Sequence, residues 1–101
     1  MNQQELDQII ENHKLWLESN GNQGKQANLD GETLNYLNLQ NADLKSCTFE
    51  KSNLQHANLN SSRTWKTSFQ NTNLNSAILE NTRNLRTCIF DNAIINHTTI
   101  D

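Results

Sequence analysis

Few residues in this chain are able to do covalent or metal chemistry. The cysteines are Cys47 and Cys88, and the histidines are His13, His56 and His97. They form no CxxC or HExxH pattern, and the 3 glycines form no phosphate-binding loop. An enzyme is expected to show a nucleophile with a base, a carboxylate pair or a metal cluster, and none stands out. The sequence therefore predicts a protein that is not an enzyme and uses neither a metal nor a cofactor.

The charged side chains suggest binding rather than catalysis. Asp and Glu number 11 and Lys and Arg number 8, which gives a net charge of -3. An acidic balance argues against a general nucleic-acid binder. No apolar run is long enough to span a membrane, and the first residues lack the basic and apolar regions of a secretory signal. We therefore expect a cytoplasmic protein.

The composition is unusual for a domain of this size. The 101 residues are only 34% hydrophobic, proline is absent, and asparagine occurs 18 times. An average globular protein has roughly 45–50% apolar residues on a slightly different residue set. The small net charge, however, does not keep the chain open by repulsion. A regular arrangement must therefore let the chain bury enough apolar surface to fold.

From Ala27 onward the sequence repeats every five residues. A large apolar residue stands at the centre of nearly every unit, and a small residue precedes most centres by two positions. Neither the period of a helix nor the alternation of a strand gives this spacing. The register slips by one residue late in the chain, where we expect a bulge at Asn81–Arg83. The centres are Leu29, Leu34, Leu39, Leu44, Phe49, Leu54, Leu59, Thr64, Phe69, Leu74, Leu79, Leu85, Phe90, Ile95 and Ile100.

This pattern resembles the pentapeptide-repeat family, whose units read Ala-(Asn/Asp)-Leu-x-x, over residues 27–101. The resemblance implies an all-β solenoid, a right-handed quadrilateral β-helix of about four coils, in which each unit forms one side of a coil. The centre and the small residue before it would point inward, and the other three positions outward. Two inward residues in five would explain how so polar a chain folds.

Residues about twenty apart should stack if four units make a coil. Phe49, Phe69 and Phe90 then fall in one column, once the extra residue is allowed for. Cys47 and Cys88 share a column two coils apart, which is about 10 Å at strand spacing. A disulfide needs Cα atoms within roughly 7 Å. Both cysteines should therefore be free thiols in the core.

The two ends of the solenoid raise different expectations. Residues 1–26 are predicted to form a capping helix and linker, and residues 27–101 the β-helix. The helix spans 3–18 and should cover the open first coil with Trp16 as its plug. His13, three residues earlier, suggests a ligand site as an alternative to simple packing. At the other end, an uncapped last coil suggests a homodimer through the C-terminal coil.

The outward positions sort the charges onto different sides of the solenoid. One set, which we call the acidic ladder, comprises Asp30, Glu50 and Asp91 on the first side, where Gln70 shares their column, and Glu80 and Asp101 on the third side. The fourth side carries a second set, which we call the basic face: Lys45, Arg63, Trp65, Lys66 and Arg86. Tryptophan with arginine is the residue mix of interface hot spots. Both sets are also explained as ordinary solvated surfaces.

The resemblance suggests a function through the acidic ladder. Pentapeptide-repeat proteins include mimics of duplex DNA, which implies a bacterial or phage protein that inhibits a DNA-handling complex. Its target would be DNA gyrase or, for a phage-type anti-CRISPR, a CRISPR surveillance complex. The alternative is an adaptor or scaffold protein that binds a protein partner through the basic face. Weak nucleic-acid binding by that face is a third hypothesis. None of these involves a membrane or a small-molecule substrate.

Overall fold

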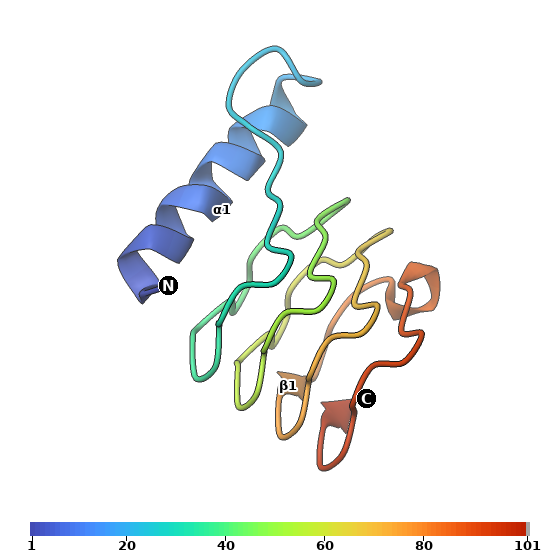
Figure 1. Ribbon diagram of the computed structural model, residues 1–101. Helices are drawn as coiled ribbons and strands as arrows, with labels where there is room; N and C mark the ends of the chain where they lie inside the picture. Colours follow the sequence, from blue (N-terminus) through green and yellow to red (C-terminus); the bar gives the residue numbers. More distant parts are fainter. Residues whose placement is uncertain (101) are drawn as a thin grey trace.

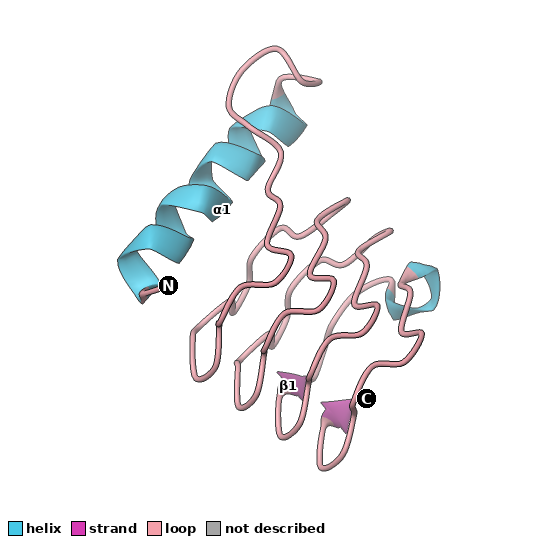
Figure 2. Cartoon of the chain, in the orientation of Figure 1, coloured by secondary structure: helices cyan, strands magenta, loops and turns pink. Residues whose placement is uncertain are grey.

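The structure, a computed structural model, describes residues 1–100. Helix α1 (Gln3–Glu18) comes first and lies across one end of a stack of looped turns (Figure 1). The remaining elements are short, namely strand β1 (Ile78–Leu79), the 3₁₀ helix η1 (Leu85–Thr87) and strand β2 (Thr99–Ile100). Most of the repeat region is drawn as loop (Figure 2). Its order therefore comes from pairing between successive turns.

Parallel backbone pairing joins residues that are twenty positions apart. Asn28 pairs with Thr48, and Thr48 pairs with Ser68. The same spacing recurs at three further positions of each turn, so four ladders run along the stack. β1 and β2 belong to one of these ladders, with parallel register. We call each twenty-residue turn a coil, and the ladder Asp43–Arg63–Arg83 its fourth side.

Asparagine has a structural role where it stands immediately before a centre. The Asn53 side-chain carbonyl accepts a hydrogen bond of 2.9 Å from the backbone N–H of Gln55. Asn and Asp form such local turns readily. The same bond is made by Asn28, Asn38, Asn58, Asn73 and Asp43. These outward residues therefore shape the backbone as well as facing the solvent.

Left-handed backbone closes the corners between sides. Residues with positive φ recur there, among them Tyr36 at 66°, Asn41 at 62° and Lys51 at 61°. Side chains with a β-carbon are strained in this region, and Asn tolerates it better than most. Asn71, Asn81 and other asparagines occupy further corners. The corners thus give a second reason for the abundance of asparagine.

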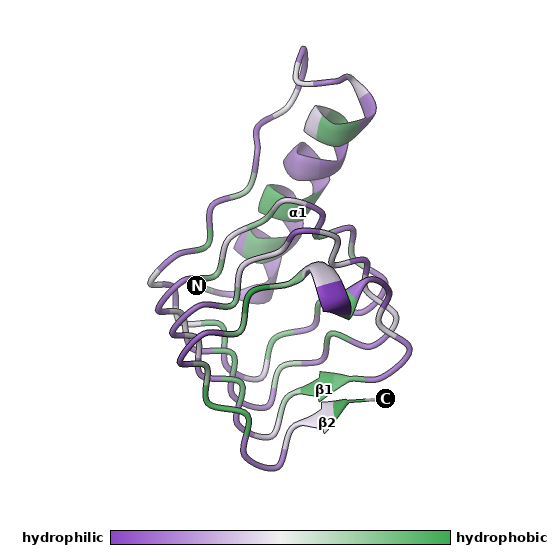
Figure 3. Ribbon diagram, turned by 90° about the vertical axis from the view of Figure 1, so that its right-hand side faces the viewer, coloured by the Kyte–Doolittle hydropathy of each residue, from purple (hydrophilic) through white to green (hydrophobic). Residues whose placement is uncertain are grey.

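Apolar side chains fill the inside of the coils in columns. The rings of Phe49 and Phe69 stack with centroids 5.3 Å apart, and Phe69 stacks on Phe90 at the same distance. The column of phenylalanines predicted from the sequence is therefore present. Hydrophobic segments recur at matching places in successive coils (Figure 3). The fully buried leucine centres are Leu29, Leu34, Leu44, Leu54, Leu59, Leu74 and Leu79.

Several inward positions are polar. The Thr72 hydroxyl donates to the Phe49 carbonyl at 2.6 Å, and the Thr64 hydroxyl donates to the Arg83 carbonyl at 2.7 Å. The buried hydroxyl of Ser62, in contrast, has no hydrogen-bond partner among the described residues. The buried threonines are therefore accommodated by hydrogen bonds to the backbone. The buried Ser62 hydroxyl lacks such a bond, so its removal from water costs free energy without compensation.

The extra residue lies later than the sequence predicted. Arg83 pairs with a residue twenty positions earlier, but Ile89 pairs with one twenty-one positions earlier. The extra residue therefore lies between Arg83 and Ile89, in the segment that contains η1. Thr82 accordingly fills the inward position, while Arg83 points outward and is exposed. The predicted bulge at 81–83 is wrong, because Thr82 is as small as the other inward residues and keeps the register.

Helix α1 is held at both ends by local contacts. At its start, the Asn2 side chain accepts from the Glu5 N–H at 2.8 Å, and the Glu5 carboxylate accepts from the Asn2 N–H at 3.3 Å. This capping box satisfies two backbone donors. The following loop returns close over the helix at Gly24, whose φ is 70°. A β-carbon there would collide with the Asn12 carbonyl and the Trp16 backbone.

The helix covers the first coil with residues of its inward face other than Trp16. Leu6 and His13 are completely buried, whereas Trp16 is only half-buried and stacks on the His13 ring. The His13 Nδ1 accepts from the Ala27 N–H at 3.0 Å, so its Nε2 donates to the Lys45 carbonyl at 2.7 Å. The expectation that Trp16 is the plug is wrong. His13 is tied into the protein by both ring nitrogens.

The far end of the stack is open. Ile95 is 51% exposed and Ile100 45% exposed, although Leu74 and Leu79 one coil earlier are fully buried. Among the described residues, no further coil covers this end. Within 1–100 there is also no helix with the length and apolar character needed to cross a membrane.

Candidate functional site

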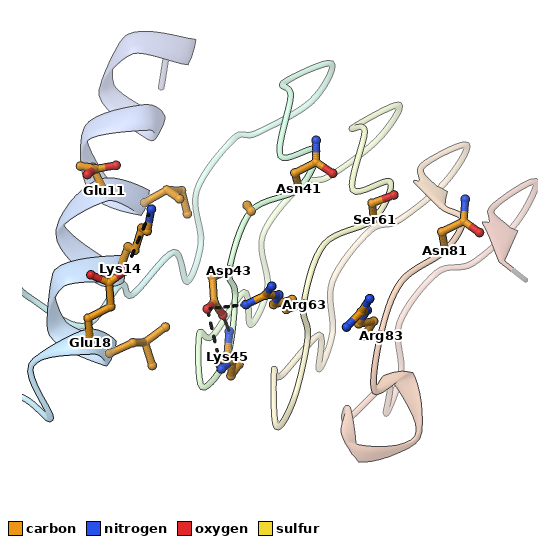
Figure 4. A pocket seen from close by; sticks show the side chains of 13 residues that line it. Glu11, Lys14, Glu18, Asn41, Asp43, Lys45, Ser61, Arg63, Asn81 and Arg83 are labelled. Carbon is orange, nitrogen blue, oxygen red and sulfur yellow. Dashed lines mark hydrogen bonds and ion pairs between the residues drawn. The ribbon is translucent and has the colours of Figure 1, made fainter.

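A groove of about 860 Å³ lies between α1 and the fourth side of the coils. Figure 4 shows α1 at one end and two rows of side chains leading away from it along the stack. One row occupies corner positions, and the other follows the fourth-side ladder. The groove is lined by Ile10, Glu11, Lys14, Leu17, Glu18, Asn41, Ala42, Asp43, Lys45, Ser61, Arg63, Asn81 and Arg83.

One carboxylate is surrounded by bases on this wall. The Asp43 side chain lies 3.8 Å from the Lys45 ammonium and 4.0 Å from the Arg63 guanidinium. Its other oxygen accepts from the Lys45 backbone N–H at 3.2 Å, which fixes its direction. One coil further on, Arg83 follows Arg63, and no carboxylate among residues 1–100 lies within ion-pair distance of it. The wall therefore ends in cations.

The structure brings together most of the predicted basic face. Lys45 and Arg63 line the groove. Trp65 takes the position of Lys45 one coil on and is 42% exposed. The Lys66 ammonium lies 4.5 Å from the Trp65 ring centroid, a cation–π contact. Arg86, however, is carried on η1 and does not line the groove.

Two basic groove residues, Arg83 and Lys14, were not among the predicted site residues. The sequence predicts that Arg83 lies in a bulge, whereas the register of the ladders places it next to Arg63. Lys14 comes from α1 and is paired with Glu18 at 4.0 Å. Helical periodicity gives the face on which Lys14 lies but not what that face meets. Only the docking of α1 reveals its place.

The acidic ladder is partly committed to holding the coils together. One oxygen of Asp30 accepts both the Thr48 hydroxyl at 2.6 Å and the Glu50 backbone N–H at 2.8 Å. The Glu50 carboxylate, half-buried, accepts from the Ser68 hydroxyl at 3.5 Å. These carboxylates therefore join neighbouring coils, as capping groups do at a helix end.

The remaining acidic residues do not form a continuous row with Asp30 and Glu50. Asp91 lies in the same row, but Gln70 separates it from Glu50. Glu80 follows β1 on a different side. Asp101 lies outside the described residues. The structure thus places the acidic ladder on more than one side of the coils.

The cysteines are free and poorly suited to act as nucleophiles. Burial, reinforced by the Asp43 carboxylate, raises the pKa of the Cys47 thiol strongly. Burial also raises the pKa of Cys88, whose thiol donates to the Thr64 carbonyl at 3.0 Å. A nucleophilic cysteine needs a lowered pKa. Within the part of the chain that the structure describes, no three His, Cys, Asp or Glu side chains are grouped to hold a metal.

The coils and the match to a family profile define the class of this protein. The model of the pentapeptide-repeat family matches residues 52–92 with 8 copies of the repeat. Residues 52–92 are therefore pentapeptide repeats, as the sequence predicted. Repeats of this family generally serve as protein–protein interaction modules.

Three solved pentapeptide repeat proteins are similar to part of this chain. A pentapeptide repeat protein of the Arabidopsis thaliana thylakoid lumen is 23% identical over 73% of this chain and 47% of its own, with a TM-score of 0.49. Rfr23 of the cyanobacterium Cyanothece 51142 is 25% identical over 76% and 45%, with a TM-score of 0.38. HetL of Nostoc, involved in heterocyst differentiation regulation, is 23% identical over 66% and 38%, with a TM-score of 0.31. The chain spans less than half the length of each. A search of curated proteins gave no match.

Proposed function

We propose that the chain is a right-handed quadrilateral β-helix, capped by α1, that works as an adaptor by binding a protein partner in the groove beside α1. The observation that carries this proposal is the groove itself, where the helix and the fourth side form two walls around Lys45, Arg63 and Arg83. A groove between two elements offers a partner more contact area than any single side of the coils.

Trp65 supports the same surface. It stands beside the groove, it is held by Lys66, and it keeps 42% of its surface exposed. Tryptophan and arginine dominate the energetics of many interfaces, since they combine large contact area with directional hydrogen bonding. The partner would thus meet Arg63 and Trp65, which project from the same side of one coil with Thr64 buried between them.

The adaptor would act without catalysis. The thiols of Cys47 and Cys88 have raised pKa values, and the groove wall offers an ion-paired carboxylate rather than a free acid–base pair. These features support binding as the activity of the site.

The inhibitor of a DNA-handling complex remains the competing prediction. It requires carboxylates arranged like the phosphates of DNA along one surface. One oxygen of the Asp30 carboxylate accepts two hydrogen bonds from the next coil, and Gln70 interrupts the row after Glu50. The groove therefore supports the adaptor better.

The two functions are separated by capturing partners from cells that encode the chain. Three baits are compared, namely the natural protein, the double variant R63Q/R83Q and the triple variant D30N/E50Q/D91N. If the chain is an adaptor that binds through the groove, the natural protein and the triple variant should capture the same protein, and R63Q/R83Q should not. Titration calorimetry with the purified partner should show the same loss of binding. Loss only with the acidic triple variant would refute the adaptor in favour of the inhibitor.

A further inference from the structure

The fourth-side ladder carries Asp43, Arg63 and Arg83 on successive coils. The Asp43 carboxylate is in contact with Lys45 and Arg63. The gap between Arg63 and Arg83 holds no carboxylate from the described residues. We propose that this gap receives a carboxylate from an acidic, extended segment of the partner, an inference that rests on the proposed function of the groove.

The chain itself shows why such a segment would be favoured. Arg63 and Arg83 are direct partners on adjacent coils, about 4.8 Å apart in backbone spacing. Like charges directly opposite each other on paired strands destabilise them. A carboxylate between the two guanidinium groups would remove this repulsion and gain two charge-assisted hydrogen bonds. Within the chain, the Asp43 carboxylate neutralises the charges of Lys45 and Arg63 in the same way.

The surroundings favour spaced carboxylates over a polyanion. Glu11 and Glu18 line the α1 wall, and Asp43 lies on the opposite wall. A nucleic acid, with a charge on every residue, would be repelled by these three groups. Isolated carboxylates separated by neutral residues would meet the cations without approaching the carboxylates.

The length of the cationic wall sets the size of the segment. From the coil of Lys45 to that of Arg83 is two coil steps, about 10 Å. An extended chain covers this in about three residues, and its alternate side chains are about 6.6 Å apart on one face. The gap between Arg63 and Arg83 thus fits one carboxylate of an extended segment, with neutral residues on either side of it. Ser61, on the neighbouring row, also lines the groove.

The test uses two fluorescein-labelled peptides, Ser-Glu-Ser-Glu-Ser-Glu-Ser and its counterpart with Gln in place of Glu. Fluorescence anisotropy is measured at low salt, where surface charge pairs are least screened. The natural protein should bind the Glu peptide and not the Gln peptide. R63Q/R83Q should weaken binding by about tenfold, which is 1.4 kcal/mol. R63K/R83K should recover part of it, and R86Q, outside the groove, should bind as the natural protein does.

Asp43→Asn gives the most specific test, because it should strengthen binding of the Glu peptide, whereas R63Q/R83Q should weaken it. Asparagine keeps the acceptor for the Lys45 N–H and the shape of the side chain but removes the competing charge. The Glu peptide should therefore bind several-fold more tightly to D43N. General damage to the groove would instead weaken binding.

Several outcomes would overturn the inference. Equal binding of the Glu and Gln peptides, or undiminished binding of the Glu peptide to R63Q/R83Q, excludes carboxylate recognition at this gap. So does an unchanged or weaker affinity of D43N, or displacement of the peptide by a single-stranded oligonucleotide at lower concentration. If any of these results is found while R63Q/R83Q still loses the captured protein, the groove remains the adaptor site and only its proposed chemistry fails.

Discussion

Gly24 is the residue through which the loop after α1 lies closest to the helix. Its φ of 70° is left-handed, and a β-carbon would approach the Leu15 β-carbon to 2.7 Å and the Trp16 nitrogen to 2.8 Å. Gly24→Ala therefore adds two costs. An alanine in left-handed backbone costs about 1–2 kcal/mol, and forcing a methyl group against packed backbone costs about 1–3 kcal/mol. The substitution should thus lower the free energy of unfolding by about 2–5 kcal/mol.

That loss is large for a protein of this size. Domains of 100 residues are stable by about 5–15 kcal/mol, and each kcal/mol moves the melting temperature by about 4–8 °C. The melting temperature of G24A should fall by about 10 °C or more. Urea unfolding, followed by circular dichroism and by the fluorescence of the neighbouring Trp16, measures the loss directly.

Gly31→Ala is the matched control for the steric cost. Gly31 has nearly the same φ, 68°, but a β-carbon there would have no atom within 4 Å. G31A should therefore show only the backbone cost of about 1–2 kcal/mol. The difference between the two variants isolates the contact between loop and helix. Equal destabilisation of G24A and G31A would refute the close packing of this loop on α1.

Four further predictions concern the interior and the open end. Ser62→Ala should leave the free energy of unfolding unchanged or raise it, because the buried hydroxyl has no partner among the described residues. Thr72→Val should lower the free energy of unfolding by about 1 kcal/mol, because a buried hydrogen bond is lost. Urea titrations of both variants check these changes. Because burial raises the pKa values of Cys47 and Cys88, the folded protein should react with iodoacetamide at pH 8 far more slowly than the urea-unfolded chain, as timed mass spectrometry would show. The same shifts mean that folded thiols hold protons more tightly than unfolded ones, so their contribution to stability is complete below about pH 8.5. It is lost as the pH rises above that, and Cys47→Ala should flatten the fall in melting temperature between pH 7 and pH 10. Finally, the exposed last coil predicts a dimer by light scattering that Ile95→Lys converts to a monomer, and a natural protein of monomeric mass would contradict it.

Periodicity predicted the interior well because each inward position is decided by residue type alone. The three phenylalanines stack as expected since a ring needs the same space in every coil. The insertion was misplaced for the same reason. Thr82 fits the five-residue pattern counted forward from Leu79, and Arg83 fits it counted back from Leu85, so either residue could take the inward position. Which of them does so depends on where the extra residue is accommodated. That place is η1, a local turn that a five-residue pattern does not reveal.

The cap and the groove depend on how two elements meet, which periodicity does not describe. The pattern of α1 identified its apolar face, and Trp16 is its largest member. Hydrogen bonds of His13 to Ala27 and Lys45, and of Gln3 to Asn38, join the helix to the first coil, and in this position Leu6 is buried. Lys14 then lines the groove, so the basic face was predicted without its helical wall.

The register of the ladders restricts how a gene for such a protein can change length. A tandem duplication of twenty codons within the repeats adds one complete coil, leaves every later residue on its original side and lengthens the groove by one step. A duplication of five codons between Arg63 and Arg83 would instead move Arg83 to the neighbouring side and break the cationic wall. Insertions that preserve the binding surface are therefore confined to whole coils, which makes groove length a property that evolves in discrete steps.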